Sequence, residues 1–221
     1  MRHLSTRIFA ILALAILGTA HAAPVPGQGT WETTLLGRDI NGNPVSINDP
    51  NAEFAYDTVL DATWYLTENH AQLTWSEAMN WAAGLTVGKF SGWVLPGTDT
   101  SCFLYNCTKS QMGELYYKAL GNSAAVLLSN TGPFKNLQPL IDWSATEDAA
   151  EPQDAWSFGF GHGVQGTFHK EVSRINSLAI RTGDILVAVP EPETYAMLLA
   201  GLGLLGATVR RRDHSANSAT A

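Results

Sequence analysis

Four carboxylates stand close together in the second half of the chain. Glu147, Asp148, Glu151 and Asp154 fall within eight residues, shortly before Trp156. Carboxylate oxygens are the ligands that Ca²⁺ prefers in proteins. The spacing does not follow the twelve-residue EF-hand loop, which needs a central Gly and a final Glu. The loop is therefore a candidate Ca²⁺ site, with no other cofactor predicted, and a simply solvated acidic loop is the alternative.

Two residue pairs could form further sites. Cys102 and Cys107 are the two cysteines of the chain, and the four residues between them exclude a C-x-x-C redox motif. In an oxidising compartment we expect them to form a disulfide that clips a short loop, and a pair of free reactive thiols is the alternative. His162 and His169 could face each other across a hairpin as two metal ligands, although hairpin histidines are usually solvated.

The sequence contains no known catalytic motif of the nucleophile-elbow, P-loop, dinucleotide-binding or H-E-x-x-H type. A glycosidase needs two carboxylates that flank a cleft, and the sequence does not single out such a pair. Between residues 23 and 189, eight Lys and Arg stand against seventeen Asp and Glu, a net charge of −9. This acidic balance excludes nucleic acid as a partner, because nucleic-acid affinity comes mostly from Lys and Arg at phosphates.

The first 22 residues have the three regions of a secretory signal peptide. Arg2 and Arg7 are basic, residues 8–17 are apolar, and Ala20-His21-Ala22 places small residues at the −3 and −1 positions. Such a segment is removed on export. We therefore expect cleavage between Ala22 and Ala23.

Two helices are predicted early in the exported chain. Residues 73–85 have apolar side chains at helical spacing, and Thr74 with Glu77 forms a capping box at the start. A second helix is expected over residues 111–120, with Ser110 as its N-cap and Gly121 just beyond its end.

Strand patterns dominate the rest of the chain. Residues 23–55 are interpreted as an N-terminal lead-in, with a turn between residues 35–40 and 45–47. The other strands are predicted as a pair or one bent strand over 56–66, a strand at 141–146, a hairpin of 155–161 with 164–169, and a final hairpin of 177–181 with 184–189. Two helices followed by antiparallel strands indicate an α+β domain.

The exported chain is rich in tryptophan, with seven in all. Most of them must be buried with their N–H groups bonded, because each indole carries a large apolar area. One or two exposed tryptophans would suit a sugar-binding face.

Residues 56–181 resemble the C-terminal domain of Legionella collagen-like protein. The likeness rests on the helix that starts at Trp75, on Trp93-x-Leu95-Pro96, on Glu114-Leu115, on Trp143-Ser144-Ala145-Thr146 and on Ala155-Trp156-Ser157-Phe158. Val94 and Gly97 replace the usual arginine and threonine, so a salt bridge of that arginine is not expected. The resemblance implies a C-type-lectin-like fold over residues 56–189 and a core framework that includes Trp93 and Trp143. It also implies a binding module for polysaccharide or matrix ligands, without catalytic residues.

The end of the chain, residues 190–213, resembles the PEP-CTERM sorting signal of Gram-negative bacteria. The signal consists of Pro190, Glu191 and Pro192, then the apolar run 196–209, then Arg210, Arg211 and Arg212. As a helix the run is about 21 Å long, too short for a comfortable membrane span, and the arginines favour the cytoplasmic side. The resemblance implies an exosortase-type processing protease as partner. Residues 214–221 are expected to be a disordered tail.

These features predict an exported, non-catalytic protein of the cell envelope or extracellular matrix. Residues 196–209 would hold it transiently in the inner membrane until it is processed. The mature protein would then bind or associate with polysaccharide. An enzyme that acts on envelope polysaccharide through an acidic pair is the alternative.

Overall fold

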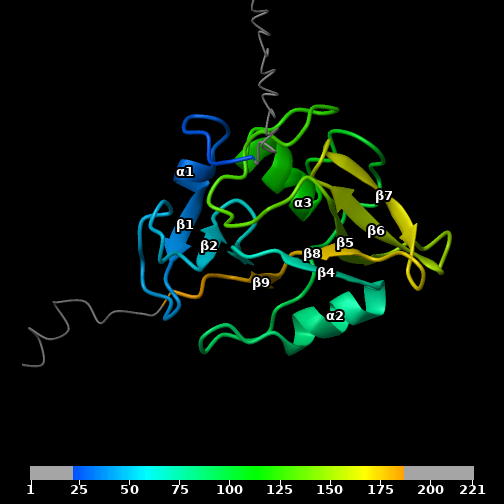
Figure 1. Ribbon diagram of the computed structural model, residues 1–221, viewed down its shortest axis with the longest axis horizontal. Helices are drawn as coiled ribbons and strands as arrows, with labels where there is room; N and C mark the ends of the chain where they lie inside the picture. Colours follow the sequence, from blue (N-terminus) through cyan, green and yellow to red (C-terminus); the bar gives the residue numbers. More distant parts are fainter. Residues whose placement is uncertain (1–21, 187–221) are drawn as a thin grey trace, which may run out of the picture.

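The structure of the protein, a computed structural model, describes residues 22–186 (Figure 1). The predicted signal peptide up to His21, the sorting signal over 190–213 and the tail 214–221 lie outside the described residues. The described part combines short helices with two sheets, which confirms the predicted α+β class.

The strands form one four-stranded and one five-stranded sheet. The first sheet has the order β1-β2-β3-β9 and is antiparallel throughout: β1 Leu35–Arg38, β2 Phe54–Asp57, β3 Ala62–Tyr65 and β9 Ile180–Thr182. The second has the order β4-β8-β5-β6-β7: β4 Asn69–Leu73, β8 Ile175–Ser177, β5 Ile141–Glu147, β6 Asp154–Gly159 and β7 Val164–His169. In this sheet β5 and β8 are parallel and the other pairs are antiparallel. Figure 1 shows β5, β6 and β7 at one end of the molecule and β1 and β2 at the other.

The first predicted helix is confirmed as α2, Trp75–Gly84. Thr74 Oγ1 accepts from the Glu77 backbone N–H, and the Glu77 carboxylate accepts from the Thr74 N–H, so the capping box is complete. The helix buries Ala78 and Ala82, which pack in a cluster with Trp143 of β5. The small alanines allow the helix to approach the five-stranded sheet closely.

The second predicted helix is divided into two parts. A four-residue α-helix, α3 (Gln111–Glu114), continues as a π-helical turn, η1 (Leu115–Ala119). Ser110 occupies the N-cap position, but its hydroxyl oxygen accepts from the Asp99 N–H at 2.8 Å and does not cap the helix. Gly121 follows the helix with φ of +66°, a left-handed conformation that favours glycine.

The hairpin predicted for 155–161 with 164–169 is confirmed, the strand pair is the correct one of the two alternatives for 56–66, and the final predicted hairpin is wrong. β2 pairs with β3, and β6 pairs with β7. The segment predicted as the single strand 177–181 is instead divided between β8 and β9, which belong to different sheets. The reason is that Leu178 and Ala179, between the two strands, are completely buried where the chain crosses from one sheet to the other. β9 pairs with β3, residues 184–186 form no strand, and 187–189 lie outside the described residues.

The lead-in proposed for residues 23–55 is largely part of the folded domain. Trp31, on the short helix α1 (Trp31–Thr34), and Leu35 are buried in the main hydrophobic core. The proposed boundary at residue 56 falls inside β2. Residues 45–47 form no strand, although the Val45 N–H donates to the Gly37 carbonyl at 3.1 Å.

The tryptophans are mainly core residues. Trp93 and Trp143 are buried, as the resemblance implied, and Trp31, Trp64 and Trp156 are buried as well. Trp75 and Trp81 are half-buried. No tryptophan in residues 22–186 is exposed enough to form the sugar-binding face considered above.

Candidate functional site

Two of the sequence segments noted above, Trp93-x-Leu95-Pro96 and Trp143-Ser144-Ala145-Thr146, lie against each other. The Ala145 N–H and the Ser144 hydroxyl both donate to the Pro96 carbonyl, at 2.9 and 2.8 Å. The Thr98 N–H donates to Thr146 Oγ1 at 3.0 Å. These contacts join the Trp-x-Leu-Pro segment to β5, and they position the loop that follows it.

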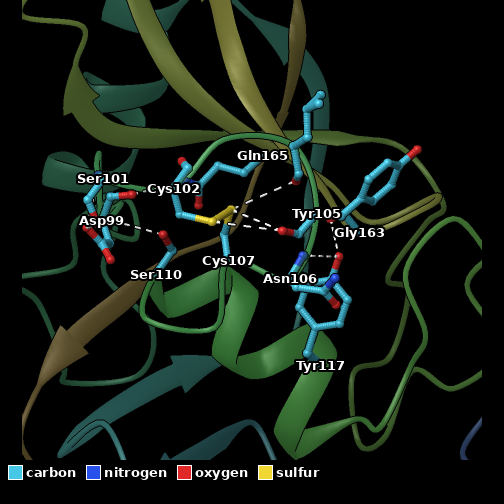
Figure 2. Close-up of a disulfide and its surroundings, with 11 residues drawn as sticks. Asp99, Ser101, Cys102, Tyr105, Asn106, Cys107, Ser110, Tyr117, Gly163 and Gln165 are labelled. Atoms are coloured by element: carbon cyan, nitrogen blue, oxygen red, sulfur yellow. Dashed lines mark hydrogen bonds between the residues drawn. A yellow bond between two sulfur atoms is a disulfide. The ribbon is translucent and has the colours of Figure 1, made fainter.

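That loop contains the disulfide between Cys102 and Cys107, which confirms the predicted pairing. Figure 2 shows the disulfide above the helix that starts at Gln111, with Gln165 of β7 beside it. The Leu104 N–H donates to the Gln165 carbonyl at 2.9 Å, and the Gln165 N–H donates back to Leu104 at 2.7 Å. The loop therefore pairs with the edge of β7.

Polar side chains hold both ends of this disulfide loop, residues 102–107. The buried Gln165 side chain donates to the carbonyls of Asp99 and Cys102, at 3.0 and 2.6 Å. Tyr117 of η1 accepts from the Asn106 N–H at 3.0 Å and donates to the Gly163 carbonyl (Figure 2). The loop is thus attached to both the helix and the β6–β7 hairpin.

The backbone of the disulfide loop is strained at two positions. Leu104 has φ of +70° and Asn106 has φ of +62°. Asparagine tolerates the left-handed region, whereas a leucine there is unfavourable and persists only when its surroundings hold it. Backbone strain of this kind often occurs at functional sites.

The tip of the disulfide loop presents apolar side chains to solvent. Phe103, Leu104 and Tyr105 are 60 %, 48 % and 41 % exposed. Three consecutive apolar residues are thus exposed on this strained and cross-linked loop. Exposed apolar clusters commonly mark contact sites. The cysteine spacing predicts only that this segment is a clipped loop. The signal for its apolar tip is the run Phe-Leu-Tyr between two closely spaced cysteines.

A groove adjoins this loop on the outer side of β5, β6 and β7. Its volume is about 390 Å³, and its walls include Leu140, Ile141, Val164 and Phe168. A Cβ atom added to Gly166, which also lines the groove, would lie 3.8 Å from the Phe103 ring. Phe103 of the disulfide loop therefore lies beside the edge of the groove, and the loop and the groove together are called here the loop–groove surface.

The groove has few polar groups. Ser157 donates its hydroxyl to the Gly166 carbonyl at 3.2 Å, and His162 lies in the turn at one end. None of the lining residues within 22–186 is Lys, Arg, Asp or Glu. A mainly apolar cavity with a few polar groups is the usual form of a small-ligand site.

The four carboxylates considered for Ca²⁺ lie in and beside the β5–β6 turn, at the opposite end of these strands from His162. Glu147 pairs with Lys170 at 3.2 Å, Asp148 accepts from the Ala150 N–H, and Glu151 accepts from the Gln153 amide. Within the described part of the chain, no three His, Cys, Asp or Glu side chains are grouped to hold a metal ion. These carboxylates, with Asp154 at the start of β6, therefore form turn contacts and an ion pair rather than one ligand set.

The two histidines do not face each other. His162 is in the β6–β7 turn, whereas His169 is at the far end of β7, opposite Asp154. The alternative in which they form a ligand pair is therefore wrong, because the register of the hairpin separates the two histidines by the length of a strand.

Glu68 and Asp142 are carboxylates inside the fold. Glu68 accepts from the Asn176 amide at 2.6 Å, the Gln138 N–H at 2.7 Å and His70 at 3.0 Å. Neither carboxyl oxygen of Asp142 has a hydrogen-bond partner within residues 22–186. Burial raises the pKa of Glu68 and raises that of Asp142 well above its usual range, with a further contribution from Glu68. Hydrolysis of a polysaccharide needs two carboxyls at an open cleft, which this buried pair does not provide.

The comparison with known protein families identifies the end of the chain. Residues 188–212 match the PEP-CTERM protein-sorting motif, which agrees with the predicted signal over 190–213. No curated protein and no solved structure matches the chain. No helix within residues 22–186 has both the length and the apolar character to cross a membrane. The motif implies a protein that is sorted to the cell envelope through the exosortase pathway.

Proposed function

We propose that this chain is an exported, non-catalytic protein of the cell envelope or extracellular matrix whose domain binds polysaccharide. The main support for export is the sorting motif, which starts at residue 188, two residues after the last described residue. The disulfide supports it, because disulfides persist in oxidising compartments outside the cytoplasm.

The membrane stage of this proposal is transient. Residues 196–209 hold the chain in the inner membrane, Arg210–Arg212 keep its end on the cytoplasmic side, and an exosortase-type protease cleaves near Pro190–Pro192. Signal-peptide cleavage between Ala22 and Ala23 fits the folded domain. The Ala23 carbonyl accepts from the Thr131 N–H at 3.4 Å, so the domain begins at about that residue.

The C-type-lectin-like fold is part of the same proposal. Its support is the direct contact between the Trp-x-Leu-Pro segment and the Trp-Ser-x-Thr segment at Pro96 and Ser144. Val94, which replaces the family's usual arginine, makes backbone hydrogen bonds with Ile180 at 2.8 and 2.9 Å. These backbone hydrogen bonds therefore attach the Trp-x-Leu-Pro segment to β9 without an arginine side chain at position 94.

The loop–groove surface is the proposed polysaccharide-binding site. Phe103 and Tyr105 are exposed aromatic side chains on a loop that the disulfide and its hydrogen bonds hold in place. Rigid aromatic side chains give a large contact area for little loss of conformational entropy. The apolar face of a sugar ring can lie on such side chains, while Ser157 and His162 offer polar contacts.

Binding is favoured over hydrolysis because the groove is lined by no carboxylate within the described residues. A Ca²⁺ ion bound near residues 147–154 would lie at the end of the β6–β7 hairpin where Phe168 pairs with Ala155, and no carboxylate of this turn lines the groove itself. The proposed polysaccharide binding does not require Ca²⁺, and the glycan screen described below is run both with and without the ion.

The test is a glycan-array screen of the protein purified from its native host, with and without Ca²⁺. We expect binding to polysaccharide fragments that falls at least tenfold in the Phe103→Ala and Tyr105→Ala variants. Val59→Ala is the matched control, because Val59 is 59 % exposed on the turn between β2 and β3, in the other sheet. Absence of glycan binding, or binding that the two loop variants leave unchanged, contradicts the proposed site.

A further inference from the structure

The groove of the loop–groove surface contains two glycines that neither backbone geometry nor packing requires. Gly159 and Gly166 are outside the left-handed region, unlike Gly163 with φ of +74°. A Cβ atom on Gly159 would have its nearest neighbour at 3.6 Å, and one on Gly166 at 3.8 Å, both ordinary contacts. By contrast, a Cβ atom on Gly161 would lie 2.9 Å from the Pro139 carbonyl oxygen.

Gly159 and Gly166 therefore leave open space between the apolar walls. Glycine in a strand lowers its stability and often marks a site where another group approaches the backbone closely. The space lies among Ile141, Val164 and Phe168, and its volume of about 390 Å³ is near the lower end for small-ligand sites. A groove of this volume can hold one small unit of a larger ligand.

From this geometry we infer that the groove binds an uncharged sugar unit that carries a methyl-ended substituent, such as an acetamido group. The inference rests on the proposed function, because it names the class of sugar that the same surface would select. The methyl group would lie between the apolar walls above the two glycines. Burial of one methyl group contributes roughly a fourfold gain in affinity, and contact of the rest of the substituent adds to it.

The polar groups fit an acetamido group. Ser157 is buried at the floor of the groove, where its Oγ uses its proton for the Gly166 carbonyl and keeps an acceptor site for an amide N–H that reaches the floor. His162 is exposed at the end of the groove and can donate to a carbonyl oxygen. A sugar unit with only hydroxyl groups would place polar atoms against the apolar walls, which is unfavourable.

The lining of the groove and the charge of the domain disfavour two other sugar classes. No Lys, Arg, Asp or Glu side chain of residues 22–186 lines the groove, so a uronate would find no lysine or arginine there and an ammonium group would find no carboxylate. The net charge of −9 for residues 23–189 also repels acidic polymers. A basic polymer would be attracted to the domain as a whole, but not to this groove.

The experiment compares three oligosaccharides by titration calorimetry with the protein purified from its native host. The first is a hexamer of β-1,4-linked N-acetylglucosamine, and the second is the matched glucose hexamer, which differs at the acetamido group. The third is an oligomer of mannuronate, which is acidic. We expect the acetylated hexamer to bind at least tenfold more tightly than the glucose hexamer and the mannuronate oligomer to show no binding.

The protein variants test whether the two glycines are responsible. The double variant Gly159→Ala, Gly166→Ala adds two methyl groups to the groove, and we expect it to lose the preference for the acetylated hexamer. Gly84→Ala is the matched control, because a Cβ atom there would have no neighbour within 4 Å and Gly84 ends α2, away from the groove. Thermal unfolding of all three proteins shows whether the fold is unchanged.

The outcomes separate this inference from the proposed function. Equal binding of the two neutral hexamers, binding of the mannuronate oligomer, or an unchanged preference in a folded double variant overturns the inference. If the glycan screen identifies a ligand without such a substituent, the inference fails and the proposed function stands. If no glycan binds at all, both fail.

Discussion

Trp93 stacks on Phe54 with their ring centroids 5.5 Å apart and their planes inclined by 20°. Both rings are buried, and Trp93 Nε1 donates to the Phe90 carbonyl at 3.1 Å. Phe54 belongs to β2, whereas Trp93 belongs to the Trp-x-Leu-Pro segment. The stack therefore packs that segment against the four-stranded sheet, and Pro96, three residues on, connects it to the five-stranded sheet.

Replacement of Trp93 by Ala should therefore destabilise the domain strongly. Loss of a buried indole costs about 3–5 kcal/mol in the free energy of unfolding. Trp143→Ala should have a similar effect, because Trp143 is buried against α2 and its Nε1 donates to the Leu73 carbonyl at 2.9 Å. Urea unfolding measures both changes. Val59→Ala, an exposed control, should change stability by less than about 0.5 kcal/mol. A Trp93→Ala protein with an unchanged unfolding midpoint would contradict the structure.

Local sequence patterns predicted the elements whose side chains alternate or repeat clearly. The capping box at Thr74 and Glu77 identifies the start of α2 from four letters, because it depends only on neighbouring residues. The division between β8 and β9 could not be predicted in this way. A completely buried pair, Leu178–Ala179, looks like the middle of a strand, and its crossing between sheets depends on partners far away in the sequence.

Removal of the disulfide by a double Cys102→Ser, Cys107→Ser substitution should loosen the disulfide loop more than it destabilises the domain. The cross-link closes a loop of only six residues, so its loss should lower the unfolding free energy by about 2 kcal/mol or less. The loop should lose hydrogen-exchange protection at Leu104 and Asn106, whose strained backbone the disulfide helps to hold.

The intact mass before and after alkylation shows whether Cys102 and Cys107 are joined in a disulfide. Protein purified from its native host should react with alkylating reagent only after reduction. Free thiols in unreduced exported protein would contradict the pairing of Cys102 with Cys107. Exchange at Trp75 and other residues of α2 provides an internal control, because this helix is outside the loop and should stay protected.

The proposed binding surface was the feature that was hardest to predict from the sequence. Phe103 and Tyr105 resemble core residues by type, and only the three-dimensional structure shows that they are exposed. The groove depends on Gly159 and Gly166, which the register of β6 and β7 places diagonally across the hairpin, with Gly159 opposite Val164 and Gly166 opposite Ser157. The four carboxylates of residues 147–154 were conspicuous in the sequence because they fall within eight residues, yet the turn uses most of them locally.

Glu114 should make the stability of the domain depend on pH. Burial and, to a lesser extent, the nearby Asp57 carboxylate raise the pKa of Glu114 from 4.5 to about 7, against the opposing effect of Lys118. The folded state therefore binds a proton more tightly than the unfolded state. The resulting stability is fully present below about pH 4.5 and is lost as the pH rises through 7, by at most about 3 kcal/mol.

The measurement compares the wild type with Glu114→Gln by urea unfolding between pH 4 and pH 8. Glutamine cannot ionise, so the stability of the wild type relative to this variant should fall as the pH rises. Glu68 and Asp142 also have raised pKa values, but they are present in both proteins and cancel in the difference. A difference that does not change with pH would show that Glu114 does not titrate in this range.

The sorting signal should be removed from the mature protein in its native host. Glu191 lies between two prolines and is costly to place inside a bilayer, so we expect it at the outer interface, accessible to the processing protease. The mature chain should then lack everything after about Pro190–Glu193. In a host without that protease the full tail should remain, and the protein should fractionate with membranes, because residues 196–209 and Arg210–Arg212 stay attached.

Peptide mapping of the C-terminus in both hosts decides between these outcomes. Peptides that contain Arg210, recovered from mature protein of the native host, would refute processing at this site.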